Sequence, residues 1–332
     1  MAANGRSGTK RNVVYCKFES EKNACRRDKP EIPAGRKDYA MKQKQTAHVL
    51  SQREIAPDIY DMWIETSLAV EAKPGQFVGV YPKDKSTLLP RPISICEISR
   101  KTDANIAAAG AGKENGNPSE RNAVYPAETD ALRIVYRIAG VGTREFSTYC
   151  AGEPIELLGP LGNGFSLFPV GEMEKGAGKK VFLMGGGIGI PPILELAKQL
   201  DTGKAEKQII LGYRDGTLFL KEDFERYGTV YVAAEDGSVG TKGNVMDAIR
   251  ENGLEADVIY ACGPMPMLRA IKKYAAERQI PAYISLEEHM ACGVGACLGC
   301  VVKTKEIDHH SHVNNARICT DGPVFEAGEV DI

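Results

Sequence analysis

Four cysteines near the end of the chain are spaced for metal chemistry. The stretch "EEHMACGVGACLGCVV" contains Cys292, Cys297 and Cys300 in a C-x4-C-x2-C pattern, and Cys319 follows downstream. Plant-type [2Fe–2S] clusters take four thiolates with this spacing, two for each iron. The intervening glycines let a loop wrap round such a cluster and direct backbone N–H groups at its sulfurs. The pattern therefore predicts that these four residues ligate a [2Fe–2S] cluster.

Zinc is the nearest alternative for this pattern. Structural zinc sites with four cysteines usually consist of two C-x2-C pairs, and this stretch has one such pair. A redox-active thiol pair is a weaker alternative, because it needs no fourth cysteine. Four cysteines already fill the ligand count, so we interpret the nearby His309, His310 and His312 as residues of a solvated loop.

The glycine-rich stretch "MGGGIGIPPILELAKQL" joins a predicted strand to a predicted helix. Gly185, Gly186, Gly187 and Gly189 let the backbone come close to a phosphate, and a helix that starts near Pro191 presents free N–H groups to it. Proline suits the first helical position, because its missing N–H would have no partner there. Such a turn can be only a tight connection. At the first strand–helix unit of an α/β domain, however, it predicts a dinucleotide site.

Two later strand ends are expected at the same edge of the sheet. In "GYRDG", Asp215 suits the free ribose hydroxyls of NAD, whereas Arg214 suits the extra phosphate of NADP, and these residues alone do not decide between them. In "ACGPMPML", Cys262 and Gly263 precede a helix that starts with proline. This position directs Cys262 into the crevice at the carboxyl edge of the sheet. The alternative for Cys262 is a small buried residue.

The motifs "RPISI" and "VYRIAGVGTREF" offer groups that suit a second nucleotide. Arg91 suits a pyrophosphate, because its planar fork pairs with two oxygens at once, and the serine of the motif adds a hydroxyl. Tyr136 offers a ring for stacking and Arg137 a further cation. Gly142 and Thr143 lie in a glycine turn that opens a short helix, where they could meet a phosphate with backbone N–H groups and a hydroxyl.

The elements that must position these residues change along the chain. Residues 45–172 show short strands punctuated by Gly and Pro, which predict an antiparallel β-barrel interrupted by a polar loop insertion at 101–122. Residues 178–285 alternate strands and helices, among them a helix over 218–228, which predicts a doubly wound parallel sheet in an α/β domain. Residues 286–332 contain the four cysteines that are predicted to ligate the cluster. Residues 1–44 are basic and lack apolar periodicity, so we expect a flexible extension there.

Composition narrows the class of protein. Charged residues make up 26% and hydrophobic residues 43% of the 332 residues, as in an ordinary globular protein. The net charge of −2 gives no reason to expect a nucleic-acid or membrane partner. Nine cysteines, an odd number, without a secretion signal favour reduced thiols in the cytoplasm.

An antiparallel barrel with an RPxS strand, followed by a nucleotide-binding α/β domain, resembles the ferredoxin–NADP reductase superfamily. The order RPIS, YR, GT, GGGIGIPP, CGPMPML, SLEEHMACGVGACLGC and CTDGPVF more closely resembles the electron-transfer subunit of bacterial NAD-dependent dihydroorotate dehydrogenase. The likeness runs from about residue 45 to the end of the chain. The basic extension and the 101–122 insertion depart from the family pattern, and the gap between Cys300 and Cys319 is longer than usual.

The resemblance implies FAD in the barrel, NAD in the α/β domain and the cluster in the C-terminal segment. It implies FAD contacts at Arg91, Pro92, Ile93, Ser94, Val135, Tyr136, Arg137, Gly142 and Thr143, and cluster ligation by the four cysteines. It also implies a partner, an FMN-containing catalytic subunit that oxidises dihydroorotate in pyrimidine biosynthesis, in a heterotetramer of two of each. No side-chain acid or base is required of this subunit.

Two other functions stay open at this point. The chain could be the flavin and iron–sulfur subunit of an NAD(P)H-linked ferredoxin or sulfide oxidoreductase, which nucleotide preference and the neighbouring gene would distinguish. It could also be a redox sensor that reuses the fold. A redox sensor is predicted to show no steady oxidation of NADH when a dye is offered as the electron acceptor.

Overall fold

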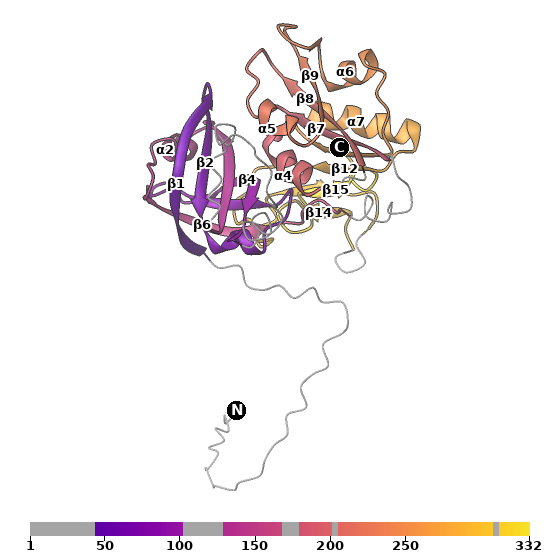
Figure 1. Cartoon of the computed structure of the whole chain (residues 1–332). Helices are drawn as coiled ribbons and strands as arrows, with labels where there is room; N and C mark the ends of the chain where they lie inside the picture. The colour runs from indigo at the N-terminus through magenta and orange to yellow at the C-terminus, as the bar shows by residue number, and fades with distance from the viewer. Residues whose placement is uncertain (1–43, 102–128, 168–178, 201–204, 308–311) are drawn as a thin grey trace, which may run out of the picture. The chain divides into compact units, whose positions relative to one another are not determined.

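A computed structural model of the chain describes residues 44–101, 129–167, 179–200, 205–307 and 312–332 (Figure 1). The expected basic extension at 1–44, apart from its last residue, lies outside the described residues. So do the 101–122 insertion, apart from Lys101, and two of the loop histidines, His309 and His310.

The first half of the chain forms a closed six-stranded barrel, as the strand pattern predicted. Its strands are β1 (Lys44–Ala56), β2 (Ile59–Glu65), β3 (Phe77–Tyr81), β4 (Arg91–Ser99), β5 (Ala131–Arg137) and β6 (Pro154–Leu161). They follow the order β1-β2-β5-β4-β3-β6, and every neighbouring pair is antiparallel. Alternate side chains such as Met62, Ile134 and Leu157 point inward and fill the barrel, because successive residues of a strand face opposite sides.

The second half forms the predicted α/β domain. Its strands are β7 (Lys179–Gly186), β8 (Ala205–Tyr213), β9 (Thr229–Ala234), β10 (Thr241–Lys242), β11 (Val258–Cys262) and β12 (Ala282–Ser285). Its helices are α4 (Pro191–Gln199), α5 (Lys221–Glu225), α6 (Val245–Glu251) and α7 (Met265–Arg278). The pattern predicted a longer helix over 218–228. Helix α5 is shorter because Leu220, the residue before it, takes a left-handed conformation with φ of 64°.

The helices cover both faces of the sheet. Side chains of α4 and α5, such as Ile193 and Phe224, pack on one face against Leu183 and Ile209. Side chains of α6 and α7 pack on the other face. The apolar faces of these helices therefore account for the nearly continuous apolar runs of β7 and β11, as expected for parallel strands that are buried on both sides.

The C-terminal segment adds strands that the sequence pattern did not predict. β13 (Val301–Lys303) and β14 (Asn315–Arg317) form a short antiparallel pair. β15 (Val324–Glu326) pairs antiparallel with β12, so the sheet has the order β10-β9-β8-β7-β11-β12-β15. The cysteine segment is thereby joined to the edge of the nucleotide-binding sheet.

A buried ion network joins the barrel to the α/β domain. Arg133 of β5 is 4% exposed and donates two hydrogen bonds to Asp61, at 2.8 and 2.9 Å, and one to Glu97 at 2.7 Å. The same guanidinium reaches Asp223 of α5 at 3.3 Å. A buried charge is tolerated only when it is paired in this way, so the network fixes one point of the domain contact.

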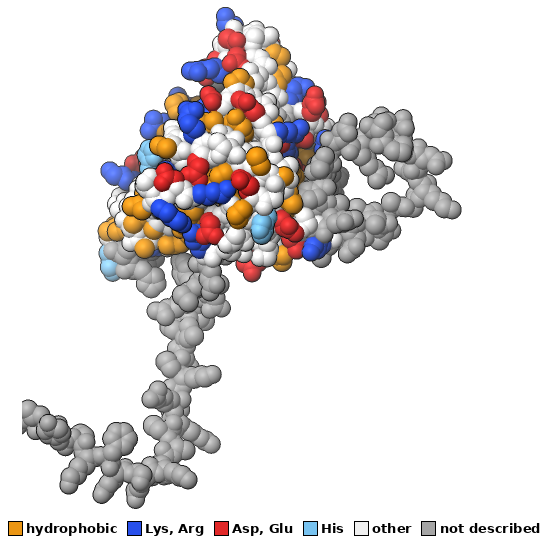
Figure 2. All heavy atoms as spheres, turned by 90° about the vertical axis from the view of Figure 1, so that its left-hand side faces the viewer, with side chains coloured by type: hydrophobic (Ala, Val, Ile, Leu, Met, Phe, Trp, Pro, Cys, Tyr) orange, Lys and Arg blue, Asp and Glu red, His pale blue; other side chains and the backbone are white. Residues whose placement is uncertain are grey.

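The outer face of the barrel carries mixed charge. Figure 2 shows lysine and arginine side chains interspersed with aspartate and glutamate over that face. No helix among the described residues is long and apolar enough to cross a membrane.

Candidate redox site

The structure brings the four predicted ligand cysteines together in pairs. The thiol of Cys297 acts to lower the pKa of the Cys292 thiol, and the thiol of Cys300 acts to raise that of Cys319, so the two members of each pair lie close enough to interact. The backbone N–H of Ile318 donates to the carbonyl oxygen of Cys300 at 2.8 Å, which holds the last two ligands side by side. Within the described ranges, no group of three or more His, Cys, Asp or Glu side chains is arranged for a single metal ion. Two pairs of thiols suit a centre in which each of two irons takes two thiolates.

Backbone N–H groups donate hydrogen bonds to the sulfurs of the first two cysteines. The N–H of Ala296 donates to Sγ of Cys292 at 3.3 Å, and that of Gly299 donates to Sγ of Cys297 at 3.4 Å. Burial raises the pKa of the Cys292 thiol, but hydrogen bonds from the backbone of Val294, Cys297 and Ala296 outweigh it and lower that pKa to about 7. The loop is therefore built to stabilise negative charge on sulfur, as a metal-bound thiolate requires.

The cysteine loop depends on close approach at two glycines. Gly293 and Gly295 have φ of 68° and 80°, in the left-handed region that favours glycine. A Cβ on Gly295 would lie 2.8 Å from Cγ2 of Thr320, next to Cys319. The turn around Cys319 is also tied to the barrel, because Nδ2 of Asn163 donates to the carbonyl oxygen of Asp321 at 2.8 Å. The cluster segment thus contacts the end of β6.

The predicted pyrophosphate groups of the barrel lie together. Arg91 opens β4, and helix α2 (Val141–Phe146) begins beside it. A Cβ on Gly142 would lie 2.8 Å from Nε of Arg91, so the guanidinium rests directly on the start of α2. The hydroxyl of Thr143 accepts from the N–H groups of Ala139 and Gly140, at 2.9 and 3.1 Å. It therefore shapes the turn that places these groups.

The ring of Tyr136 does not face outward, which corrects the prediction of a stacking surface. It is 1% exposed, stacks on Tyr60 inside the barrel and donates from its hydroxyl to Gln52 at 2.9 Å. Strand alternation is the reason: Tyr136 points into the barrel, whereas Arg137 and the buried Val135 point to the other side. Only the backbone of Tyr136 is left to contact a cofactor. On β4, Pro92, Ile93 and Ser94 are half-buried and lie opposite β3.

The glycines at the end of β7 and directly after it have two different tasks. Gly186 and Gly187 line a cleft, and Gly187 has φ of 53°. Gly185 and Gly189 instead allow close packing, because a Cβ on Gly189 would lie 2.5 Å from the carbonyl oxygen of Cys262. Helix α4 begins at Pro191, as predicted, after the short 3-10 turn η4 (Gly187–Gly189).

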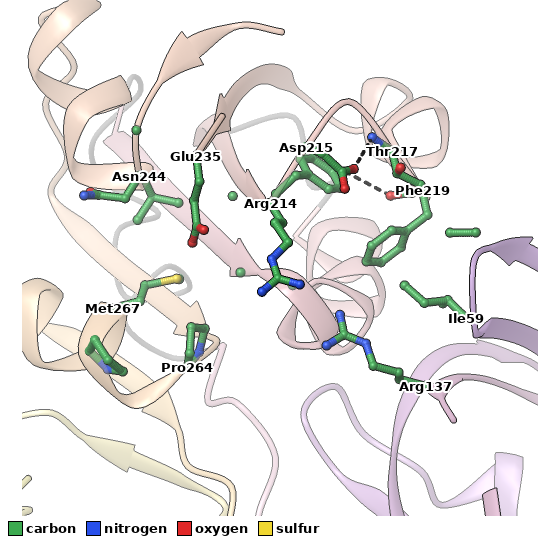
Figure 3. A pocket seen from close by; sticks show the side chains of 18 of the residues that line it. Ile59, Arg137, Arg214, Asp215, Thr217, Phe219, Glu235, Asn244, Pro264 and Met267 are labelled. Carbon is green, nitrogen blue, oxygen red and sulfur yellow. Dashed lines mark hydrogen bonds between the residues drawn. The ribbon is translucent and has the colours of Figure 1, made fainter. Parts of the chain in front are cut away.

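A cleft of about 1060 Å³ lies between the barrel and the carboxyl ends of β7, β8 and β9 (Figure 3). Arg214 and Asp215 line it, as predicted for the residues after β8. Asp215 accepts a hydrogen bond from the N–H of Thr217 at 2.9 Å, and its hydrogen bonds to Thr217 lower its pKa. Met267 and Pro264 of the α7 region close the opposite wall.

The structure adds to the sequence-based prediction at Arg137 and Glu235 and corrects it at Cys262. Arg137, expected at the flavin, lines this cleft, and its guanidinium points toward that of Arg214 (Figure 3). Cys262 is 1% exposed and belongs to the core, so its thiol does not line the cleft, and Gly263 beside it packs on Met267. Glu235, which the sequence reasoning missed, lines the cleft after β9. The sequence could have indicated Glu235, because it directly follows a predicted parallel strand, and ligands bind at the edge of the sheet where such strands end.

A closed flavin-type barrel, a doubly wound sheet with a glycine-rich first turn and a four-cysteine segment define a reductase-like class of redox protein. Solved structures share this fold. An NADH-dependent reduced ferredoxin-NADP oxidoreductase, studied for flavin-based electron bifurcation, matches with a TM-score of 0.67 and 27% identity over 86% of this chain and 89% of that one. A ferredoxin NADP+ reductase from Neisseria gonorrhoeae with bound FAD and NADP matches with a TM-score of 0.50 and 15% identity over 70% of this chain and 91% of that one, which shows the fold alone.

Sequence comparison identifies the family. Residues 287–331 match the family model described as the iron-sulfur cluster binding domain of dihydroorotate dehydrogenase B. A dihydroorotate dehydrogenase B (NAD(+)) electron transfer subunit from Streptococcus mutans is 38% identical over 86% of this chain and 98% of its own length. One from Bacillus cereus is 40% identical over 87% and 99%. The chain belongs to the family of dihydroorotate dehydrogenase B electron transfer subunits.

Proposed function

We propose that this chain is the electron-transfer subunit of an NAD-dependent dihydroorotate dehydrogenase and links a catalytic subunit to NAD. The observation that carries the proposal is the pairing of Cys292 with Cys297 and of Cys300 with Cys319 in a segment that contacts both the barrel and the nucleotide-binding sheet. When bound, a [2Fe–2S] cluster carries single electrons, a nicotinamide takes only hydride, and a flavin exchanges both. The protein's own task is to hold these groups in place.

We propose the division of labour that the sequence predicted. The barrel at 45–172 holds FAD, the domain at 178–285 holds NAD, and the segment at 286–332 holds the cluster through its four cysteines rather than zinc. At the flavin, Arg91 and the start of α2 would hold the pyrophosphate, since the guanidinium rests on Gly142. The half-buried Pro92, Ile93 and Ser94, with the backbone of Val135 and Tyr136, would complete the site.

The cleft supports NAD as the nucleotide. Gly186 and Gly187 bring backbone to the place where a phosphate would approach, and Arg214 with Arg137 supplies positive charge there. Asp215 and Glu235 line the same cleft and suit ribose hydroxyls, whereas two carboxylates would repel an added phosphate. Arg137 lines this cleft, and its predicted contact with the flavin remains part of the proposal.

A catalytic partner follows from the name of the relatives, electron transfer subunit. We propose that the partner holds FMN, oxidises dihydroorotate and forms a heterotetramer with two copies of each chain. The cysteine loop is the surface that supports this docking. Val294 and Leu298, between the ligands, are 45% and 66% exposed, and a short path from the cluster to the partner needs such a contact. Thiolate ligands and free cysteines suit the reducing cytoplasm.

Co-purification with the candidate catalytic subunit tests the proposal. Anaerobically prepared complex should contain FAD, FMN, iron and acid-labile sulfide, and should couple NADH oxidation to orotate reduction. The variant C319S should lose iron and sulfide, whereas C150S, which removes an exposed cysteine outside the segment, should keep both. Protein that contains zinc but no acid-labile sulfide would contradict the [2Fe–2S] assignment. A loaded complex that never couples NADH to orotate would overturn the dihydroorotate assignment and leave the two alternatives, an NAD(P)H-linked ferredoxin or sulfide oxidoreductase and a redox sensor.

A further inference from the structure

Arg317, the last residue of β14, connects the two parts of the cysteine segment. Its Nη1 donates to the carbonyl oxygen of Gly295 at 3.3 Å, and its Nε donates to Oδ2 of Asp321 at 3.2 Å. Gly295 lies between Cys292 and Cys297, whereas Asp321 follows Cys319 by two positions. The guanidinium therefore lies between the loop and the turn that together carry the thiols.

The carbonyl that Arg317 contacts belongs to a peptide group with a second role. The N–H of that same peptide is the N–H of Ala296, which donates to Sγ of Cys292 at 3.3 Å. Cation, peptide and sulfur thus form one chain of hydrogen bonds. Members of such a chain polarise one another, so a cation on the carbonyl makes the N–H a stronger donor to sulfur.

The backbone around Arg317 holds the guanidinium in this place. Its carbonyl oxygen accepts from the N–H groups of Thr320, Asp321 and Gly322, at 3.1, 2.8 and 3.2 Å. Its own N–H donates to Oδ2 of Asp321 at 2.8 Å. Gly295 completes the approach, because it meets Thr320 with no side chain between them. The side chain of Arg317 is 38% exposed, so solvent screens its charge only in part.

We propose that Arg317 is a positioning residue that strengthens the Ala296 N–H bond to Cys292 and thereby raises the reduction potential of the cluster. Hydrogen bonds to the sulfurs and nearby charge are two of the protein's means of setting that potential. More positive surroundings favour the reduced form, which carries one more electron. The inference rests on the proposed cluster ligation and adds a residue that no ligand pattern contains.

The test compares Arg317→Met with Arg317→Lys and with the control Lys303→Met in the full-length holoprotein. Lys303 lies on β13 of the same strand pair and is exposed, so its removal takes away one charge without touching the loop. Potentiometry followed by electron paramagnetic resonance should show a lower midpoint potential in R317M, most of the potential restored in R317K, and no change in K303M. Iron release to a chelator should be roughly tenfold faster in R317M, because the removal of a group that orients a metal ligand typically weakens metal binding by about that factor or more.

A second readout reports on the hydrogen bond itself. The shift of the Fe–S vibrations on exchange into deuterated water should be smaller in R317M than in the wild type, because the Ala296 bond weakens. The double variant R317M/D321N should keep the lowered potential, which excludes the bare Asp321 charge as the cause. If R317M retains no cluster, the variant Arg317→Gln is measured in its place. The midpoint potential of the cluster in R317Q should then lie below that in R317K.

Equal potentials in the wild type, R317M and K303M would overturn the inference, as would an equal drop in R317M and K303M. So would a double variant that returns to the wild-type potential. All of these outcomes leave the proposed function standing, because each requires a loaded cluster. Wild-type protein without iron and labile sulfide would instead remove the proposed function itself.

Discussion

Glu195 of helix α4 accepts a hydrogen bond from the backbone N–H of Ile98, at 2.8 Å, across the contact between the two domains. Lys198, one turn later, donates to the carbonyl oxygen of the same Ile98 at 2.7 Å. β3 pairs with β4 only from Arg91 to Ser94, so these helix side chains satisfy the part of β4 that β3 leaves open. The helix that follows the nucleotide loop is thereby fixed to the strand that carries the flavin motif.

The variant Glu195→Ala should destabilise the protein through this contact. The carboxylate is 1% exposed, and its removal leaves the buried N–H of Ile98 without this partner. An unsatisfied buried donor costs about 1–3 kcal/mol, so the free energy of unfolding in urea should fall by roughly that amount. Lys221→Ala, which removes a surface ion pair with Glu225, should change it by less than about 1 kcal/mol. Equal losses in both variants would contradict a special role for the contact.

The same carboxylate should make stability depend on pH. Burial raises the pKa of Glu195 above its ordinary value of 4.5, although Lys198 opposes the shift. A raised folded-state pKa stabilises the protein most below 4.5, and this contribution is lost as the pH rises through the folded-state value. The variant Glu195→Gln keeps the shape without titrating. The stability of the wild type relative to E195Q should therefore fall as the pH rises above 4.5, measured by urea denaturation at each pH, and a rise would contradict the assignment.

The sequence alone singled out the four cysteines but gave no sign that Glu195 is buried. Strand and helix patterns predicted the barrel and the parallel sheet, because apolar residues recur with the period of each element. Pro191 predicted the start of α4, because proline suits the first helical position. The cysteine spacing predicted which thiols would meet. Periodicity could not predict β15, which is three residues long and pairs with β12, far earlier in the chain. Nor could it show that Glu195 or Arg133 is buried, since their partners come from other elements.

The sequence motifs showed which residues belong to a functional strand, but they did not show to which side of the strand each side chain points. Tyr136 and Arg137 are adjacent, so strand alternation sends one into the barrel and the other to the cleft. Which of them faces inward depends on the register of β5 with β2 and β4. That register is a property of the closed barrel rather than of the motif, so the motif alone could not show that the ring of Tyr136 is buried.

Gly142→Ala should weaken flavin binding. The new Cβ would lie 2.8 Å from Nε of Arg91, so the guanidinium must move off the start of α2. The matched control is Gly140→Ala, because nothing lies within 4 Å of a Cβ at Gly140 and its φ of −177° is open to any residue. The FAD content of purified protein, and the rate of FAD loss on dilution, should change in G142A and stay constant in G140A. Full FAD retention in G142A would show that the position of Arg91 does not matter.

Glu235→Gln should relax the preference for NAD over NADP. The carboxylate lies in the cleft beside Arg214 (Figure 3), where it would repel a ribose phosphate. Removing the charge should raise the ratio of kcat/KM for NADPH to that for NADH by at least about tenfold, or 1.4 kcal/mol. Asp236→Asn is the control, since Asp236 bonds to Ser238 and does not line the cleft. An unchanged ratio in E235Q would leave Asp215 as the acidic determinant of the choice.

Leu298→Glu should weaken assembly with the catalytic subunit. Leu298 is 66% exposed between Cys297 and Gly299, and a buried leucine contributes about 1.5–3 kcal/mol relative to an exposed one. Burying a carboxylate there would cost more, so the dissociation constant should rise by at least about tenfold. Val70→Glu tests an exposed apolar residue of the barrel domain, 58% exposed in the 3-10 turn Ser67–Val70, and should leave assembly unchanged. Iron and sulfide content must stay equal in both variants, because a lost cluster would also loosen the loop. If L298E retains its cluster and binds the catalytic subunit as tightly as the wild type does, the cysteine loop is not the docking surface.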